Sequence, residues 1–315
     1  MAKPALLVVS GPTASGKTRL AVDLAKKLGG EIICTDSMQV YKGMEIGTAA
    51  PTLEEQQEVP HHLFGFLEPE QSFSVASYLE LARAVIEDIT ARGALPVLCG
   101  GTGLYISCLI DNIRFDLVAS QNPGRRDELR RMAGEKGPEY LWGMLKDVDP
   151  QLAEKLHPNN LGRIIRAIEV YEASGVPMSE WQRRAAAHQS PYDVCFLALS
   201  YAQRSLLYDR IDRRVEVMLE QGLLDEAKAL RGKNCAGTAM QAIGYKELFA
   251  HLDGQQTLAE AVETLKRQTR RYAKRQLTWL RRDERVHWLE LDTFESYEDL
   301  LVQALERVRQ SGIYN

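Results

Sequence analysis

The chain has 315 residues, which suits about two domains or one large domain with an insertion, and 45% of its residues are hydrophobic, enough for a substantial core. Its formal net charge of −4 argues against indiscriminate binding to nucleic acid, and five widely spaced cysteines without a C-x-x-C pair argue against a zinc site. No stretch has the length and apolar character of a secretory signal or a membrane span, so we expect a cytoplasmic protein.

The first predicted element is an apolar strand over 5–9, which leads into a phosphate-binding loop. The loop sequence GPTASGKT matches the pattern G-x-x-x-x-G-K-[ST], and an amphipathic helix is expected to follow it. In such a loop, backbone N–H groups and the positive end of the helix bind phosphate oxygens, while the last hydroxyl can bind magnesium. The predicted phosphate ligands are Gly11, Pro12, Thr13, Ala14, Ser15, Gly16, Lys17 and Thr18, with Thr18 as the metal ligand. The pattern alone leaves open whether a triphosphate or another diphosphate binds.

A second strand is predicted over 31–34, a helix over 72–92 and a buried strand over 95–99. Strands that alternate with helices predict a parallel sheet with helices on both faces and a ligand site at the carboxyl ends of the strands. We therefore expect the phosphate loop and the segments after the other two strands to share one cleft.

Asp36 follows the second strand, which we expect to neighbour the strand of the phosphate loop. A carboxylate there can hold magnesium or accept a proton from a nucleophile. The alternative is that Asp36 only caps the next turn. The turn Gly100–Gly103 also has two interpretations. Its glycines could let the backbone and Thr102 approach a substrate closely, or they could be required only by the conformation of the turn.

His61 and His62 follow a proline in a predicted loop, without a third metal ligand at suitable spacing. We therefore expect local hydrogen bonding from these side chains.

Between 115 and 191 the alternation of strands and helices gives way to helix-like segments rich in arginine. We interpret this region as an inserted helical domain that divides the core into residues 1–114 and 192–315. After it we predict a strand over 193–199, helices near 206–221 and 243–252, a long basic helix over 258–282, a strand over 286–291 and a terminal helix.

The predicted basic helix carries two rows of cations at i,i+4 spacing. Like charges at this spacing repel one another, so an anionic partner is one interpretation. Arg125, Arg126, Arg163 and Arg166 of the insertion would extend the cationic surface. The alternative is a solvated helix face that nearby acidic residues balance. The rows are Lys266, Arg270, Lys274 and Arg267, Arg271, Arg275.

Several stretches together resemble the bacterial tRNA dimethylallyltransferases, also called tRNA isopentenyltransferases. The most specific are DSMQVY at 36–41, PHHL at 60–63 and GGTGLY at 100–105, in this order after the phosphate loop. Further matching stretches lie at 46–49, 157–159, 163–171, 242–247 and 269–281, so the resemblance runs nearly end to end. It implies an α/β fold with a parallel, P-loop NTPase-like sheet flanked by helices and an inserted helical domain that binds tRNA.

The resemblance also implies a reaction. A dimethylallyl group would pass from dimethylallyl diphosphate to the exocyclic N6 amine of the adenosine 3′-adjacent to the anticodon in tRNA, with release of diphosphate and with Mg²⁺ as cofactor. The partners would be tRNA and dimethylallyl diphosphate, without a membrane, and we expect a monomer. The phosphate loop would then hold a leaving diphosphate.

Roles for individual residues follow from the resemblance as hypotheses. Lys17 would neutralise the diphosphate together with either Arg210 or Arg214, and Asp36 would accept the amine proton. Thr102 completes the expected catalytic set and contacts the substrate nucleotide. The residues expected to contact tRNA are Asp36, Ser37, Met38, Gln39, Thr102, Arg126, Gly162, Arg163, Ile164, Ile165, Arg166, Arg270 and Lys274.

Two other functions fit parts of the sequence. A P-loop small-molecule kinase would use Asp36 to activate a hydroxyl toward ATP, but it leaves the basic helix and the arginine-rich insertion unexplained. A non-catalytic tRNA-binding protein would keep only a vestigial nucleotide site.

Overall fold

The computed structural model describes residues 3–113, 123–186, 189–235 and 237–314. The chain divides into an α/β unit, Met1–Ile110 with Pro191–Asn315, and a helical unit, Asp111–Ser190. The expected boundaries of the insertion were 115 and 191. No helix among the described residues is both long and apolar enough to cross a membrane.

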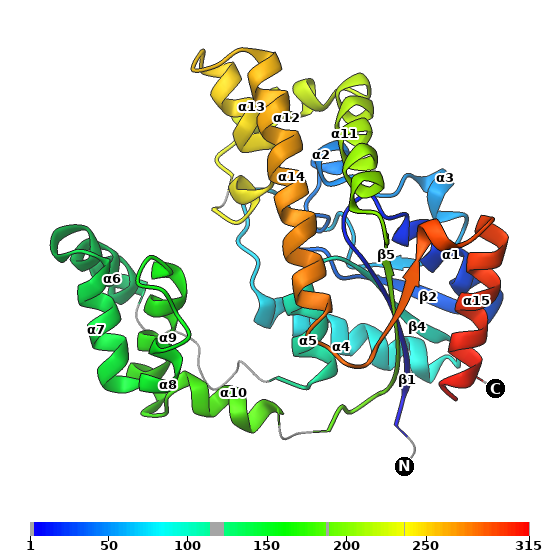
Figure 1. Cartoon of the computed structure of the whole chain (residues 1–315), viewed down its shortest axis with the longest axis horizontal. Helices are drawn as coiled ribbons and strands as arrows, with labels where there is room; N and C mark the ends of the chain where they lie inside the picture. The colour runs from blue at the N-terminus through cyan, green and yellow to red at the C-terminus, as the bar shows by residue number, and fades with distance from the viewer. Residues whose placement is uncertain (1–2, 114–122, 187–188, 236, 315) are drawn as a thin grey trace. The chain divides into compact units, whose positions relative to one another are not determined.

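The α/β unit contains all six strands that are described and the helices that surround them (Figure 1). The strands are β1 (Ala5–Ser10), β2 (Gly30–Cys34), β3 (His61–His62), β4 (Leu95–Gly100), β5 (Asp193–Ser200) and β6 (Val286–Glu290). The helices are α1 (Lys17–Leu28), α2 (Glu45–Thr48), α3 (Leu53–Gln56), α4 (Val75–Ala91), α5 (Gly103–Ile110), α11 (Arg204–Glu220), α12 (Leu223–Arg231), α13 (Tyr245–Leu252), α14 (Leu258–Leu280) and α15 (Tyr297–Gln310).

The sheet is parallel throughout, with the strand order β3-β2-β4-β1-β5-β6. The expectation that β2 neighbours β1 is wrong, because β4 lies between them and pairs with both. Parallel strands end at the same edge of a sheet, so the segments after β1, β4 and β2 still emerge side by side. The central place of β1 puts the phosphate loop in the middle of this edge.

The core explains why the strand sequences are almost continuously apolar. Alternate residues of a strand face opposite sides. Leu7 and Val9 of β1 pack in the cluster that includes residues of α1 and α15, while Leu6 and Val8, also fully buried, point to the opposite face. All the buried strands are thus covered on both faces, as in other parallel sheets.

The helical unit has its own apolar core. Its helices are α6 (Pro123–Lys136), α7 (Pro138–Val148), α8 (Pro150–Ala153), α9 (Leu161–Ser174) and α10 (Met178–Ala186). Leu129 of α6, Leu141 and Leu145 of α7 and Ile168 of α9 pack together in one cluster. The helical character expected for this region is confirmed.

Two elements differ from the sequence-based expectations. The segment around His61 and His62 is not a loop throughout, since both residues form the short edge strand β3 beside β2. Helix α12 was not predicted. Hydrogen bonding is local, as expected, for His61, whose Nδ1 lies 2.7 Å from the carbonyl oxygen of Val59. His62 instead bonds across to β2, where its Nε2 lies 2.7 Å from Glu31 Oε2.

Glu31 on β2 is a buried carboxylate that ties the edge of the sheet to α4. Besides His62, it accepts hydrogen bonds from Arg92, one of them from Nη2 at 2.9 Å. The bonds from Arg92 lower the pKa of Glu31 from its usual 4.5 to about 2. A carboxylate in such surroundings stabilises the folded state only while it is ionised.

Replacing Glu31 with glutamine should therefore destabilise the protein at neutral pH, on the order of 2 kcal/mol. Since the folded-state pKa of Glu31 is depressed, the wild-type advantage is present above pH about 4.5 and is lost as the pH falls toward 2. Urea unfolding of both proteins at several pH values measures this. A difference in unfolding free energy that stays constant between pH 7 and pH 3 would contradict the assignment.

Candidate active site

The phosphate loop joins β1 to α1, which begins at Lys17. Gly16 caps the helix in the left-handed conformation, with φ of 83°, which explains the second glycine of the pattern. The hydroxyl of Ser15 is buried and has no hydrogen-bond partner among the described residues. A buried polar atom without a partner is costly in a finished fold, so Ser15 indicates a ligand at this loop.

Lys17 and Arg214 supply the positive charge of the site. Burial lowers the pKa of Lys17, and the nearby Arg214 guanidinium lowers it further. Burial also lowers the pKa of Arg214, which forms no hydrogen bond or ion pair with any residue that the structure describes. Two partly buried cations that lie close together favour an anionic ligand between them, and a diphosphate is an anion of this kind.

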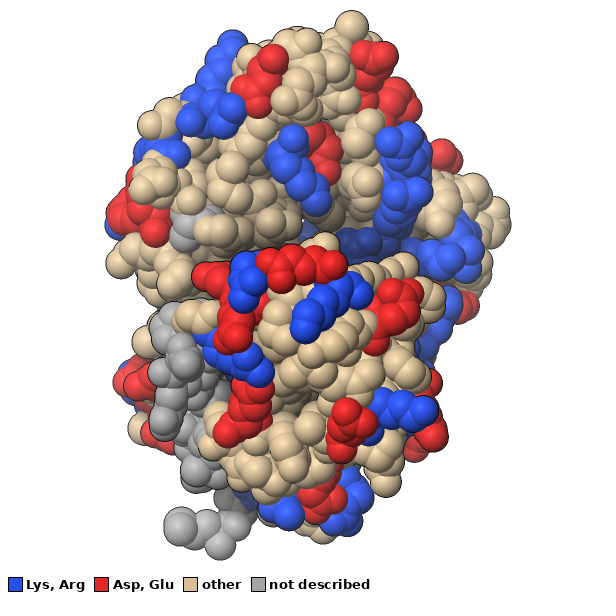
Figure 2. Space-filling model, turned by 90° about the vertical axis from the view of Figure 1, so that its left-hand side faces the viewer, with Lys and Arg blue, Asp and Glu red and all other residues tan. Residues whose placement is uncertain are grey.

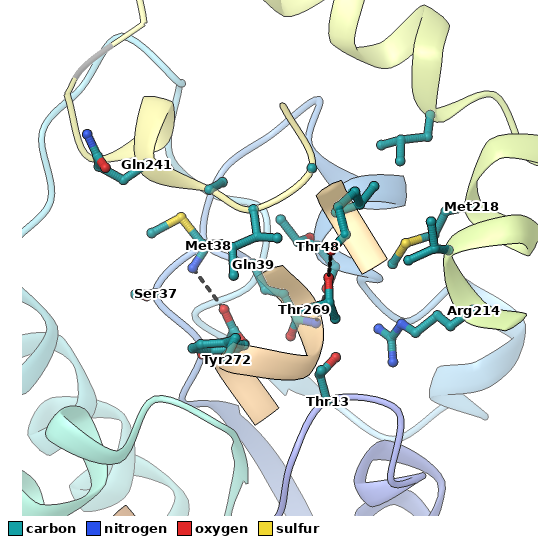
Figure 3. A pocket seen from close by; sticks show the side chains of 18 of the residues that line it. Thr13, Ser37, Met38, Gln39, Thr48, Arg214, Met218, Gln241, Thr269 and Tyr272 are labelled. Carbon is teal, nitrogen blue, oxygen red and sulfur yellow. Dashed lines mark hydrogen bonds between the residues drawn. The ribbon is translucent and has the colours of Figure 1, made fainter. Parts of the chain in front are cut away.

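The structure distinguishes the two arginines between which the sequence did not decide. Arg214 lines the cavity at the phosphate loop, and its side chain reaches from α11 toward Thr13 (Figure 3). Arg210, one turn earlier, is exposed, and its Nε donates a 3.0 Å hydrogen bond to the carbonyl oxygen of Ala14. Arg210 thus stabilises the backbone of the phosphate loop at Ala14, whose φ is 65°, while Arg214 faces the cavity.

Asp36 shapes the turn after β2 and also faces the cavity. Its Oδ1 accepts a 2.9 Å hydrogen bond from the Met38 N–H, which shapes the turn after β2 (Figure 3). The other carboxylate oxygen has no hydrogen-bond partner among the described residues, and Asp36 lines the same cavity as Lys17 and Arg214. The turn therefore fixes the carboxylate and leaves one oxygen for a substrate.

Thr102 lies just behind this carboxylate turn. Its Oγ1 accepts a 3.0 Å hydrogen bond from the Ser37 N–H, and its hydroxyl also bonds to the hydroxyl of Tyr272. Thr102 is not among the residues that line the cavity, whereas Ser37 and Tyr272 are. In the described structure Thr102 orients its neighbours.

The glycines after β4 serve close packing. None of Gly100, Gly101 and Gly103 has a positive φ. An added β-carbon at Gly101 would lie 2.0 Å from Nε2 of Gln276, and one at Gly103 would lie 2.2 Å from the Trp279 ring. Gly101 and Gly103 are therefore glycine because α14 lies directly on the turn, while a β-carbon at Gly100 would meet Thr35 at 2.4 Å. Close packing is a third explanation beside the two expected from sequence.

Several of these groups converge on a cavity of about 360 Å³ within the α/β unit. Its polar lining includes Thr13, Lys17, Asp36 and Arg214, and its apolar lining includes the side chains of α11, α12 and α14. The amide of Gln39 also lines it, although its Nε2 donates to the carbonyl oxygens of Thr48 and Ala49, each at 3.0 Å. The apolar residues are Met38, Val215, Met218, Leu223, Ile243 and Leu265.

The donors at the loop suit a magnesium ion that arrives with phosphate. No group of three or more His, Cys, Asp or Glu side chains able to hold a metal occurs among the described residues. Magnesium commonly relies on one or two protein oxygens together with substrate phosphates and water. The Thr18 hydroxyl, which bonds to the Cys99 thiol, and the Asp36 carboxylate are oxygens of this kind.

In the helical unit the expected tRNA contacts separate into buried and exposed residues. Ile164 and Ile165 are 0% and 4% exposed, so the expectation that their side chains meet a partner is corrected. Gly162 and Arg163 at the start of α9 are exposed. Arg126 donates to both carboxylate oxygens of the buried Glu169, at 2.9 and 2.6 Å, and Arg166 Nη1 lies 3.8 Å from the same carboxylate.

The basic helix α14 is less cationic than its sequence indicates. Arg270 Nη1 lies 2.5 Å from Asp212, and Lys266 Nζ lies 2.9 Å from Glu216, both carboxylates of α11. For the row containing Arg270 the structure therefore favours the alternative of balance by acidic residues, since α11 compensates two of its three charges. On the face drawn in Figure 2, acidic side chains likewise stand beside many basic ones.

Other cations of α14 stay open to solvent. Lys274 and Arg271 are exposed and form no ion pair with the described residues. Arg275 is also exposed, lies 5.5 Å from the Tyr272 ring centroid and lines the cavity. A stripe of charge thus runs from the cavity along α14.

Sequence reasoning missed Gln276, whose buried side chain bridges α14 and the phosphate loop. The Thr13 N–H donates to its Oε1 at 2.9 Å, and its Nε2 donates to the Gly101 carbonyl oxygen at 3.0 Å. A glutamine among cations gives no local signal for such a role. The bridging role becomes visible only in the structure, where Gln276 lies so close to Gly101 that a β-carbon would not fit there, although Gly101 has no positive φ.

Comparison with known proteins agrees with this arrangement. The family model described as IPP transferase matches residues 39–283, and the one described as Isopentenyl transferase matches residues 4–64. The chain belongs to the IPP transferase family. It is 50% identical over 295 residues to a tRNA dimethylallyltransferase of Geobacillus thermodenitrificans, which covers 93% of this chain and 92% of that protein. It is 46% identical over 299 residues to the tRNA dimethylallyltransferase of Caldanaerobacter subterraneus, covering 94% of each.

Solved structures of the IPP transferase family share the fold. The tRNA isopentenylpyrophosphate transferase of Bacillus halodurans has a TM-score of 0.73 and 43% identity, over 98% of this chain and 97% of that one. A eukaryotic dimethylallyltransferase acting on tRNA has a TM-score of 0.82 and 29% identity, over 99% of this chain and 80% of that one. The parallel sheet flanked by helices and the family membership confirm the expected fold class.

Proposed function

We propose that this protein transfers the dimethylallyl group of dimethylallyl diphosphate to the N6 amine of the adenosine 3′-adjacent to the anticodon in tRNA. The observation that carries the proposal is the cavity that Lys17, Arg214 and the carboxylate of Asp36 line together, in which neither cation forms an ion pair with a described residue. One part of this cavity suits a leaving diphosphate, and the other suits a nucleophile that must lose a proton.

The diphosphate end of the reaction uses the phosphate loop. Lys17, Arg214 and the loop N–H groups neutralise the charge that develops on the diphosphate oxygen as the allylic C–O bond breaks. Substrate oxygens and the Thr18 hydroxyl would hold a magnesium ion, which would supply further charge neutralisation. The apolar part of the lining, with Met218 and Leu223, suits the hydrocarbon group.

The amine end of the reaction uses Asp36. The lone pair of an aryl amine is delocalised, so the amine is a weak nucleophile until its proton is removed. The free carboxylate oxygen accepts that proton while the new N–C bond forms and the diphosphate departs. Met38 N–H holds the other oxygen, so the carboxylate keeps one orientation throughout.

The target base must leave the stack of the anticodon loop to enter the cavity. Unstacking costs a few kcal/mol, and the cost is smallest in a single-stranded loop. Phosphate contacts of the exposed cations on α14 and on the helical unit offset it. Among the residues expected at this interface, Arg163 and Lys274 are the exposed cations without an ion pair to the described residues.

Replacing Arg271 and Lys274 together with alanine should weaken tRNA binding and reduce the salt slope of the affinity by about 2, one for each lost phosphate contact. The matched control replaces Arg307 and Arg309, exposed cations of α15, in the same way. Filter binding over a range of salt concentrations measures both. Equal slopes for the two double variants would assign α14 to the solvated-face alternative.

A single assay separates this proposal from its rivals. Purified protein, unmodified tRNA and labelled dimethylallyl diphosphate should yield labelled tRNA and free diphosphate. ATP consumption without transfer would instead support a P-loop kinase, and tRNA binding without either reaction would support a non-catalytic protein. Monomeric state and cytoplasmic location are part of the proposal, and light scattering with cell fractionation tests them.

A further inference from the structure

Gln276 is a buried polar residue that the reaction described above does not use. The residue belongs to α14, and only 6% of its surface is exposed. Its acceptor oxygen binds the Thr13 N–H and its amide nitrogen binds the Gly101 carbonyl oxygen. Both hydrogen-bonding functions of the amide therefore connect α14 to segments that follow strands of the sheet.

The bond to Thr13 matters because of what lies on the other side of the same peptide group. The Pro12–Thr13 peptide is trans, so its carbonyl points away from its N–H. That carbonyl oxygen accepts from the Ser15 N–H at 3.3 Å and from Lys17 Nζ at 3.5 Å. Holding the Thr13 N–H on one side thus directs the Pro12 carbonyl toward the Lys17 ammonium on the other.

We propose that Gln276 is a positioning residue that sets the location of the Lys17 ammonium by orienting the Pro12–Thr13 peptide. The inference rests on the proposed function, because it assumes that Lys17 binds the diphosphate. Without Gln276 only the 3.3 Å bond from the Ser15 N–H still holds this peptide, so the carbonyl orients Lys17 less firmly before the diphosphate arrives.

Gly101 supports this role independently. A β-carbon there would approach Gln276 Nε2 to 2.0 Å, while its next neighbour, the Gly11 carbonyl oxygen, would stay at 3.5 Å. Apart from Gln276, the site has room for a methyl group. Gly101 thus allows the Gln276 amide to reach the sheet edge.

The first test replaces Gln276 with methionine, which has similar length but cannot accept a hydrogen bond. The KM for dimethylallyl diphosphate and the Kd of inorganic diphosphate, measured by calorimetry, should rise roughly three- to tenfold, the factor that one neutral hydrogen bond is worth. The KM for tRNA should not change. The matched control is Gln268→Met, two turns earlier on α14, whose side chain bonds to none of the described residues.

A purely structural role predicts a different result. It would lower the melting temperature and the active fraction, and therefore kcat, while both diphosphate constants stay at the wild-type value. That outcome would overturn the inference. If the wild-type protein neither transfers the dimethylallyl group nor binds diphosphate, the proposed function itself fails.

A double-mutant cycle provides the second test. Gly101→Ala should displace Gln276 and raise the Kd of inorganic diphosphate about as much as Gln276→Ala does. In the Gln276→Ala background the same change should have little further effect, because the clash is gone. Additive effects of the two substitutions would show that Gly101 acts on the site without Gln276, against the proposal.

Discussion

Asp36→Asn should lower the rate of dimethylallyl transfer by roughly 10²–10⁴-fold, the usual contribution of a positioned general base. Asparagine keeps a side-chain oxygen in place of Oδ1, so it can still accept the Met38 N–H and preserve the turn after β2. It cannot take the amine proton. The loss should therefore appear in the chemical step, with little change in tRNA affinity.

Single-turnover kinetics with saturating enzyme measure that step directly. Ser37→Ala is a suitable control, because it alters the next side chain of the turn without removing the carboxylate and should leave the rate within about tenfold of wild type. A near-normal single-turnover rate for Asp36→Asn would show that Asp36 does not accept the proton and that its role is limited to shaping the turn after β2.

Arg214→Met should lower kcat/KM for dimethylallyl diphosphate by roughly 10²–10³-fold, as expected for a preorganised charge that stabilises a leaving group. Methionine retains much of the aliphatic volume beside the cavity. It removes the guanidinium that faces the phosphate loop, and it also raises the pKa of Lys17, since Arg214 is the nearby cation that depresses it.

Arg210→Met is the matched control for Arg214→Met. Arg210 has the same side chain one helical turn away but contacts the Ala14 carbonyl oxygen instead of lining the cavity. Its loss should cost about tenfold or less, because Arg210 is exposed and one ordinary hydrogen bond contributes about 0.5–1.5 kcal/mol. Equal losses for the two variants, measured with the same tRNA, would contradict the distinction between them.

The parts of the site that local sequence encodes were predictable. The phosphate loop and the Asp36 turn each lie within a few residues of a strand end, so pattern and chemistry could be read together. The choice between Arg210 and Arg214 was not, because residues four apart share one face of a helix and only the packing of α11 decides which one reaches the cavity.

Long-range pairing accounts for what the sequence analysis left undecided or did not find. The row of cations on α14 indicated an external anion, yet Asp212 and Glu216 of α11 neutralise Arg270 and Lys266 from more than forty residues away in the chain. The bond between Thr13 and Gln276 joins residues near the two ends of the chain. Neither pairing has a periodic signature, so only the folded structure reveals it.

The two cations of the site also bear on the evolution of the protein. Arg214 lies close enough to Lys17 to lower its pKa, so we expect a neutral side chain at either position to increase the stability of the fold. Selection for stability alone would remove one of them. Their presence together marks a trade between stability and activity, in which the protein tolerates strain at rest and binding of the diphosphate relieves it.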